Sequence, residues 1–251
     1  MIRMRLDAAL TGLGLCSSRN RAQTLISEGH VTVNGIICLK ASQNVTEADV
    51  LRVTEELPFV GRGGYKLRYA LSEFHLNLSG MRCLDIGAST GEFTDCMLQN
   101  GAASVLAVDV GHGQFADALR GDARVRLLEG TDIRALSPEE EGLPAEFAAC
   151  DVSFISLTQI FPVLPRLMKP HAKAVMLVKP QFEAGKQALN KHGVVKDEKV
   201  RQRVVKNTQD AAALNGFIPL GCCESPIQGG SGNTEYLLLL ENNNAGNEGS
   251  T

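Results

Sequence analysis

Four ionisable side chains stand where predicted strands end or predicted elements begin, and together they could move a proton. Two are lysines and two are carboxylates, at Lys66, Asp151, Lys179 and Glu235. A partly desolvated lysine beside another cation can lose its proton and act as a base, whereas a charged lysine can stabilise a developing anion. Both roles are open for Lys179, with Asp151 and Glu235 orienting the lysines.

A glycine-bearing turn follows the strand predicted at 82–87. In Gly87-Ala88-Ser89-Thr90-Gly91 the two glycines permit a sharp turn and the close approach of a ligand. Asp109 ends the next predicted strand, where it could accept hydrogen bonds from the ribose hydroxyls of an adenosine. Asp85 either caps the turn or meets the ligand, and a carboxylate there repels a pyrophosphate but attracts a sulfonium. The turn therefore favours S-adenosylmethionine over a nicotinamide dinucleotide.

Strands and helices alternate through the larger part of the chain. The predicted strands are 82–87, 104–109, 125–130, 146–152, 172–178, 217–223 and 235–241, and the predicted helices are 65–77, 91–101, 112–120, 156–168 and 197–214. This order predicts an α/β fold with a doubly wound, mostly parallel seven-stranded sheet. The last two strands should be antiparallel, because no helix separates them. The carboxyl edge of such a sheet is where ligands bind, and it would gather the four ionisable residues.

The first 52 residues predict a separate, small α+β unit. Apolar residues recur at helical spacing from Leu6 to Leu13, and a second helix should begin after Ser17 or Ser18. Two β-rich runs flank Asn34-Gly35, which is the strongest short-range signal for a hairpin. We therefore expect helix, helix and hairpin in this unit.

The remaining boundaries follow from composition. Pro58 opposes helix, so residues 53–60 are predicted to be an extended linker. The low-complexity stretch 242–251 is predicted to be a disordered tail. The predicted organisation is thus a unit at 1–52, the linker, an α/β domain at 61–241 and the tail.

Composition excludes several classes of protein. The net charge of −3 does not by itself indicate a nucleic-acid partner, so any basic contact surface must be local. Seven cysteines without CxxC spacing argue against a disulfide framework or a metal site and favour a reducing cytoplasm. We expect no signal peptide and no membrane-spanning helix, since no apolar run approaches 18 residues. Nothing in the sequence indicates an oligomeric state.

The N-terminal pattern is similar to a known RNA-binding module. Arg5-Leu6-Asp7, Ser18-Arg19 and Val33-Asn34-Gly35 resemble the small module named after ribosomal protein S-four, over residues 5 to about 52. The resemblance implies that the second helix and the hairpin present basic side chains to RNA. The residues concerned would be Arg5, Arg19, Arg21 and Lys40, with Arg62 beyond the module. A single arginine taken alone favours a solvated surface charge, and only the whole pattern favours RNA binding.

The α/β part resembles the TlyA family. The matching stretches are Gly63-Gly64-Tyr65-Lys66-Leu67, Gly87 to Gly91, Asp151 to Leu157, Lys179 to Glu183 and Gly232 to Tyr236. The resemblance implies a Rossmann-like class I methyltransferase of the FtsJ type that methylates a cytidine 2′-hydroxyl of ribosomal RNA. It implies a ribosomal RNA or ribosomal subunit as partner and a catalytic tetrad of Lys66, Asp151, Lys179 and Glu235. Cofactor contacts are implied for Asp85, Gly87, Ala88, Ser89, Thr90, Gly91, Asp109, Asp132 and Asp151.

Three positions depart from the family pattern. Glu92 stands where a second glycine is usual, Asp132 where asparagine is more common, and Gly61 where serine is usual. These changes bear on cofactor affinity more than on the type of reaction. A basic stretch at 186–196 could close over RNA phosphates or be a plain solvated loop.

Two other functions are compatible with parts of the pattern. A ribosome-binding protein with impaired catalysis is one, favoured weakly by Glu92 and opposed by the complete tetrad. A membrane-active haemolysin is the other, because some TlyA-like proteins carry that label. The absence of a long apolar span argues against membrane insertion.

Overall fold

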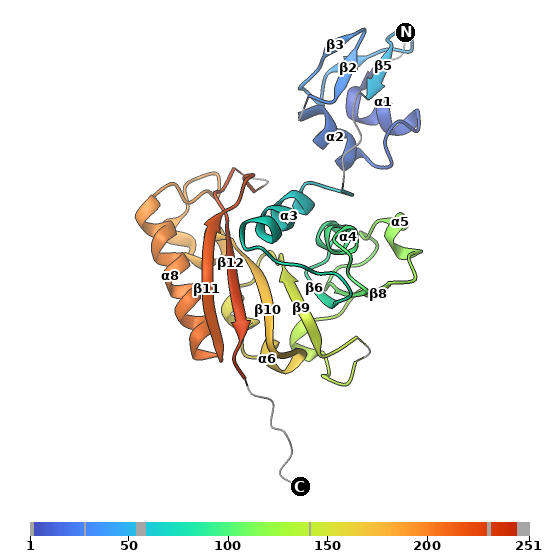
Figure 1. The fold of residues 1–251 in the computed structure, drawn as a ribbon. Coiled ribbons are helices and arrows are strands. Elements are labelled where there is room, and N and C mark those ends of the chain that lie inside the picture. Colours follow the sequence, from blue (N-terminus) through green and yellow to red (C-terminus); the bar gives the residue numbers. More distant parts are fainter. Residues whose placement is uncertain (1–2, 28, 54–58, 141, 230–231, 245–251) are drawn as a thin grey trace. The chain divides into compact units, whose positions relative to one another are not determined.

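The computed structural model describes residues 3–27, 29–53, 59–140, 142–229 and 232–244. The chain forms two compact units, Met1–Arg62 and Gly63–Thr251 (Figure 1). Most of the predicted linker and most of the predicted tail fall at 54–58 and 245–251, outside the described residues.

The larger unit is built on a seven-stranded sheet. The strands are β6 (Arg82–Ile86), β7 (Ser104–Val108), β8 (Val125–Leu128), β9 (Ala145–Cys150), β10 (Met168–Val178), β11 (Phe217–Glu224) and β12 (Tyr236–Asn242). Their order across the sheet is β11-β12-β10-β9-β6-β7-β8. Neighbours from β10 through to β8 are parallel, and β12 is antiparallel to both β10 and β11. The predicted mostly parallel sheet with an antiparallel closing pair is confirmed.

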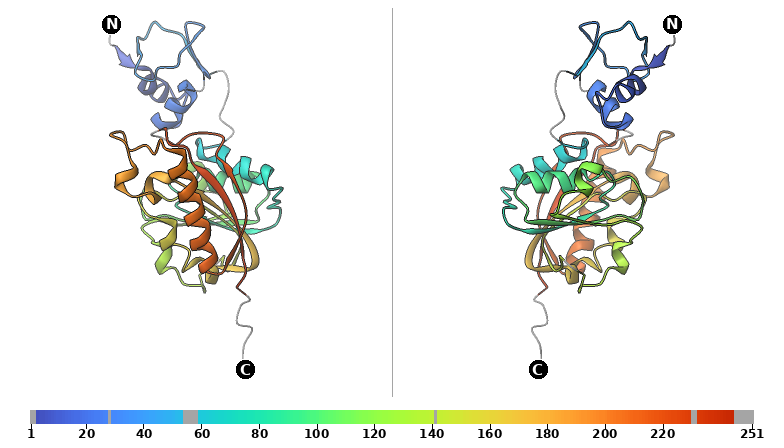
Figure 2. Two further views of the ribbon diagram at one scale, coloured as in Figure 1. Left: turned by 90° about the vertical axis from the view of Figure 1, so that its left-hand side faces the viewer. Right: turned by 90° about the vertical axis from the view of Figure 1, so that its right-hand side faces the viewer.

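Helices cover both faces of this sheet. The α-helices are α3 (Gly63–Glu73), α4 (Glu92–Gln99), α5 (Asp117–Arg120), α6 (Leu164–Leu167), α7 (Pro180–Glu183) and α8 (Glu198–Leu214). Figure 2 shows α8 on one face and α3 with α4 on the other. The alternation of the strands sorts their side chains accordingly: Leu84 and Ile86 join the core that includes Val204 of α8, whereas Asp85 contacts Thr94 of α4.

Two predicted helices are wrong in extent. Instead of 112–120, only Asp117–Arg120 is helical, because the amides of Gly111 and Gly113 bond to the side chains of Asp109 and Glu129 and hold the chain in a loop. Instead of 156–168, a 3₁₀ turn at Leu157–Gln159 precedes the short α6. Pro162 and Pro165 lack the amide hydrogens that a continuous helix would need there.

The smaller unit contains the predicted helices and hairpin. Helices α1 (Leu6–Gly12) and α2 (Arg19–Ser27) pack through Leu6, Leu10, Leu25 and Ile26, all buried. Strands β2 (Val31–Val33) and β3 (Ile36–Ile37) form the hairpin around Asn34-Gly35, whose residues both have positive φ. Three short strands were not predicted: β1 (Met4–Arg5) pairs with β4 (Asn44–Val45), and β5 (Leu51–Val53) pairs with β2.

Candidate active site

Strand register brings the predicted site residues to one edge of the sheet. Val178 of β10 pairs with Tyr236 of β12, so Lys179 and Glu235 stand next to that pair at the same edge. Cys150 of β9 pairs with Ile86 of β6, and the amide of Asp151 donates to the Ile86 carbonyl at 2.9 Å. Strand β6 lies between β7 and β9, so the chain order reverses here. In open α/β sheets, this switch point is where ligands bind.

Lys179 and Asp151 form the first ion pair of the site. The Lys179 Nζ lies 2.5 Å from Asp151 Oδ1 and donates to Ser153 Oγ at 2.8 Å. Both charged side chains are largely buried, with 11% and 19% of their surface exposed. An ammonium group has three donors, so these contacts leave one for a ligand. Ser153 was not among the predicted site residues, although it belongs to the stretch Asp151 to Leu157 that matches the family pattern.

Lys66 and Glu235 form a second, more deeply buried pair. Lys66 Nζ, from α3, lies 2.7 Å from Glu235 Oε2. Gln181 Nε2 donates to the other Glu235 oxygen at 3.4 Å, and Gln181 belongs to the α7 turn that directly follows Lys179. The four predicted catalytic residues are therefore brought together as two pairs, which Gln181 links.

A cavity of about 140 Å³ joins the glycine turn to the first ion pair. It is lined by Gly87, Ala88, Ser89, Glu92, Phe93, Asp151, Ser153 and Lys179. Gly87 has a φ of +80°, and a Cβ there would lie 2.6 Å from the Asp151 carbonyl oxygen. Only glycine can therefore bring the turn this close to the end of β9.

Asp85 differs from its predicted position. It lies inside β6 rather than in the turn, is fully buried, and does not line the cavity. Its Oδ2 accepts from Thr94 Oγ1 at 2.6 Å, while Oδ1 has no hydrogen-bond partner among the described residues. Burial raises the pKa of this carboxyl to about 7, the bonds from Thr94 oppose the rise, and the charges of Asp151 and Asp109 add to it.

Asp109 holds the glycine turn against the end of β7. Its Oδ2 accepts from the Ser89 amide at 2.7 Å and its Oδ1 from the Gly111 amide at 2.6 Å. Each carboxylate oxygen keeps a second lone pair, so Asp109 can still accept from a hydroxyl group.

Asp132 is bound to its own neighbour. The carboxylate accepts from the Arg134 amide at 2.9 Å and from Arg134 Nη2 at 2.6 Å, and these bonds lower its pKa. Four of the predicted cofactor residues line the cavity (Gly87, Ala88, Ser89 and Asp151). Asp85, Thr90, Gly91, Asp109 and Asp132 do not.

The chemistry of the cavity suits a ligand with cationic groups. The acidic side chains of Glu92 and Asp151 line it. Asp85, which is buried and has one oxygen without a hydrogen-bond partner among the described residues, adds a third acidic group whose charge interacts with that of Asp151. Lys179, the single cation in the lining, is neutralised by Asp151. Such surroundings attract a sulfonium or an ammonium and disfavour a pyrophosphate.

Comparison with known proteins settles the family. The model of the FtsJ-like methyltransferase family matches residues 59–242, and that of the S4 domain matches residues 4–51. The chain belongs to the FtsJ-like methyltransferase family. The predicted resemblances to this enzyme type and to the S-four RNA-binding module are confirmed. The protein is therefore a methyltransferase with S-adenosylmethionine as its methyl donor.

Full-length relatives share both parts. The 16S/23S rRNA (cytidine-2′-O)-methyltransferase TlyA of Mycobacterium tuberculosis is 43% identical over 95% of this chain and 90% of its own. Hemolysin A of Brachyspira hyodysenteriae is 38% identical over 93% of this chain and 98% of its own. A solved structure named as a hemolysin from Streptococcus thermophilus superposes with a TM-score of 0.76, at 41% identity, over 96% of this chain and 89% of that chain. No helix in the described part of the chain is both long and apolar enough to span a membrane.

An exposed aromatic residue of the methyltransferase domain was missed in the sequence. Phe154 directly follows Ser153, is 90% exposed and has a φ of +66°. Its ring packs on that of Phe182, with the centroids 5.1 Å apart, and Lys179 Nζ lies 5.9 Å from the Phe182 centroid. A non-glycine residue at such a φ is strained, so the surroundings must hold the ring outward. The available signal was a phenylalanine three residues after Asp151, in the loop that follows β9.

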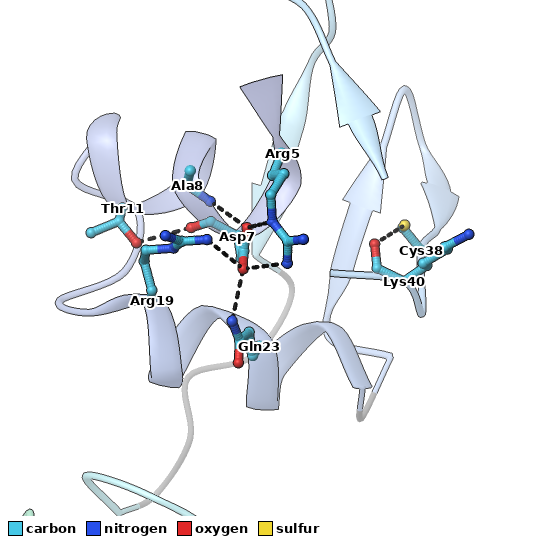
Figure 3. Close-up of polar contacts among 8 residues, drawn as sticks. All are labelled: Arg5, Asp7, Ala8, Thr11, Arg19, Gln23, Cys38 and Lys40. Carbon is cyan, nitrogen blue, oxygen red and sulfur yellow. Dashed lines mark hydrogen bonds and ion pairs between the residues drawn. The ribbon is translucent and has the colours of Figure 1, made fainter. Parts of the chain in front are cut away.

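The S4 domain does not gather all its predicted RNA-binding residues. Arg5 and Arg19 meet at one buried carboxylate, Asp7, whereas Lys40 lies apart from them (Figure 3). Arg21 is part-buried and donates to the Phe59 carbonyl at 2.8 Å. Arg62 is also part-buried, and its Nε is enclosed. Arg5 and Arg19 are thus the pair best placed to reach a partner.

Proposed function

We propose that this methyltransferase transfers a methyl group from S-adenosylmethionine to the 2′-hydroxyl of a cytidine in ribosomal RNA. The observation that carries the proposal is the Lys179–Asp151 pair in the wall of the same cavity as the glycine turn. Proton-handling groups and a cofactor loop at one place are what methylation of a hydroxyl requires. The choice of ribosomal RNA and cytidine is supported by the relative named for that activity, which is 43% identical.

A ribose hydroxyl is a poor nucleophile near neutral pH, so the protein must align it and help it lose its proton. S-adenosylmethionine, when bound, supplies a methyl group that is already electrophilic. Alignment alone can contribute about 7–11 kcal/mol. We infer that the remaining Lys179 donor binds the hydroxyl oxygen and stabilises its developing negative charge, while the Asp151 carboxylate accepts the proton that the hydroxyl loses.

The second ion pair has a positioning role in this proposal. Lys66 and Glu235 do not line the cavity, and the Glu235 side chain is linked to the Lys179 turn through Gln181. Their contact fixes α3, the start of β12 and the turn relative to one another. A 2.7 Å pair that is almost completely buried is costly to break, so the turn is held rigidly.

Residues around the cavity would bind the cofactor and the target nucleotide. The backbone of the turn 87–91 would contact the cofactor, and Asp109 would bind its ribose. Asp85 would act through its charge. Asp132 would contribute only if it leaves Arg134. Phe154 offers an exposed face beside Ser153 on which the target base could stack, worth about 1–3 kcal/mol.

The S4 domain would supply phosphate contacts. An enzyme acting on ribosomal RNA is expected to work in the cytoplasm.

The test is to map 2′-O-methyl groups on ribosomal RNA from cells with and without the gene. Loss of methylation at one or a few cytidines, restored by the wild-type gene but not by Lys179→Ala, is the expected result. An unchanged methylation map overturns the proposal. A lost methyl group on another nucleotide overturns only the cytidine assignment.

A further inference from the structure

One buried carboxylate of the S4 domain accepts five hydrogen bonds. Asp7, in the first turn of α1, is 0% exposed. Its Oδ1 accepts from Arg5 Nε at 3.0 Å and from the Ala8 amide at 2.9 Å. Its Oδ2 accepts from Arg5 Nη2 at 2.9 Å, Arg19 Nη2 at 3.2 Å and Gln23 Nε2 at 2.7 Å (Figure 3). This is more bonding than the fold of two short helices requires.

The two arginines that meet at Asp7 come from different elements. Arg5 ends β1 and Arg19 begins α2, yet both Nη2 atoms contact the same Asp7 oxygen, so their guanidinium groups are neighbours. Each side chain nevertheless remains about half exposed, at 47% and 54%. One edge of each guanidinium thus faces the carboxylate while other donors face solvent.

Both guanidinium groups keep N–H donors that are available to a ligand. A guanidinium has five N–H donors. Arg5 gives two of them to Asp7 and Arg19 gives one, and neither has a further protein partner in the part of the chain that the structure describes. Two arginines and one aspartate also leave a net positive charge. The outward-facing donors match the oxygens of a phosphate.

Without Asp7 this arrangement would be unfavourable. Two adjacent guanidinium groups repel each other, and each long side chain would lose rotamer entropy on being fixed. The buried carboxylate offsets both costs in advance. It stays ionised because the hydrogen bonds from Arg5 hold its pKa well below the usual range, despite burial.

We infer that Asp7 is a positioning residue for RNA binding, which holds Arg5 and Arg19 side by side as a preformed site for the phosphodiester backbone. The inference rests on the proposed function for the identity of the RNA. Preorganisation of this kind increases affinity because less order has to be imposed when the ligand binds.

The net charge of the site and the positioning role of Asp7 predict opposite effects of the Asp7→Asn substitution on RNA affinity. Asp7→Asn removes a negative charge beside two arginines, so charge alone predicts tighter RNA binding. Positioning predicts weaker binding, because asparagine has an NH2 donor in place of one accepting oxygen and so cannot accept all the bonds that Asp7 accepts from Arg5, Arg19 and Ala8. Asp49→Asn is the matched control: Asp49 lies in the same domain and accepts from Asn34 and Thr46, but it contacts no arginine in the described part of the chain.

The experiment measures binding of the full-length protein to a ribosomal RNA fragment at several salt concentrations. We expect Asp7→Asn to weaken binding about tenfold and to reduce the slope of log K against log salt by about one, and Asp49→Asn to leave the slope unchanged. In an Arg5→Gln/Arg19→Gln background, Asp7→Asn should have no further effect. Amide hydrogen exchange of α1 and α2 checks that the S4 domain of each variant is folded, because these helices carry Asp7 and Arg19.

A second variant keeps the inference testable if Asp7→Asn does not fold. Arg5→Lys preserves charge but cannot form the two-bond contact with Asp7, so its RNA binding should fall as well. Unchanged or tighter binding by Asp7→Asn, or an equal loss in the background without the arginines, overturns the inference alone. If the wild-type protein does not bind the RNA fragment, the proposed function and the inference both fail.

Discussion

Two buried carboxylates of the methyltransferase domain have opposite surroundings. Glu235 is paired with Lys66 at 2.7 Å, whereas Asp85 has no ion pair among the described residues and one oxygen without a hydrogen-bond partner there. Burial accordingly raises the pKa of Asp85 to about 7. A buried carboxylate with only one of its oxygens bonded destabilises a fold when it is ionised, and such residues cluster at functional sites.

Replacing Asp85 should therefore stabilise the protein in a pH-dependent way. Its folded-state pKa lies above the unfolded value of 3.8, so between about pH 4 and pH 7 the folded chain keeps a proton that the unfolded chain has lost. Stability is consequently lost as the pH rises through this window. We expect Asp85→Asn to raise the free energy of unfolding by about 1–3 kcal/mol at pH 8 and by much less at pH 5. Urea denaturation at both pH values measures this; an equal effect at both would contradict the assignment.

Lys179 is the residue on which the reaction should depend most. Lys179→Ala removes the donor aimed into the cavity but leaves the cofactor turn intact, so methyl transfer should fall at least about a hundredfold with little change in S-adenosylmethionine affinity. Lys173→Ala, in the middle of β10 and outside the cavity lining, is the control and should keep full activity. Wild-type turnover of Lys179→Ala at saturating RNA would show that the tetrad assignment is wrong.

Among the elements, the turn after β6 depends most on backbone conformation. Gly91 has a φ of +91°, and a Cβ there would lie 2.5 Å from Leu119 Cδ1 and 2.9 Å from Phe115 Cε2. The turn, α5 and the loop before it are thus packed against one another. Gly91 is also the N-cap residue of α4, which begins at Glu92.

A matched pair of glycines tests this packing. Gly80 also has a positive φ, of +74°, but a Cβ there would meet nothing within 4 Å. Gly80→Ala should lose only about 1 kcal/mol of stability through backbone strain, whereas Gly91→Ala should lose about 2–4 kcal/mol because overpacking adds to the strain. Thermal unfolding of both variants gives the comparison. Similar losses would mean that α5 moves away at little cost.

For the whole molecule, the two domains should separate affinity from chemistry. The cavity and both ion pairs belong to the unit Gly63–Thr251, while Arg5 and Arg19 belong to the S4 domain. Phosphate contacts determine affinity and position on RNA rather than the rate of the chemical step.

Arg19→Gln should therefore raise the KM for ribosomal RNA several-fold and leave kcat and cofactor affinity unchanged. Arg203→Gln, on the exposed surface of α8, serves as the control for loss of one positive charge. Steady-state methylation at varied RNA concentration separates KM from kcat. A fall in kcat with an unchanged KM would assign Arg19 to the chemical step instead.

The amino-acid sequence by itself determined the order of the elements and the edge at which the site forms. Apolar runs and βα alternation are local signals, and a parallel sheet necessarily gathers the carboxyl ends of its strands, so Asp151 and Lys179 had to meet near the glycine turn. The Asn34-Gly35 hairpin is similarly encoded by two residues. The predicted helix at 156–168 failed because the prolines within it outweighed its apolar periodicity.

The tertiary structure alone decided the partners. Lys66 and Glu235 are 169 positions apart in the sequence, and their pairing depends on the register of β12 and on where α3 packs. The burial of Asp85, the capture of Asp132 by Arg134 and the meeting of Arg5 and Arg19 at Asp7 are also choices among nearby ions. Charge attraction is not specific for sequence, so residue types can indicate that such contacts form, but only packing determines which ones do.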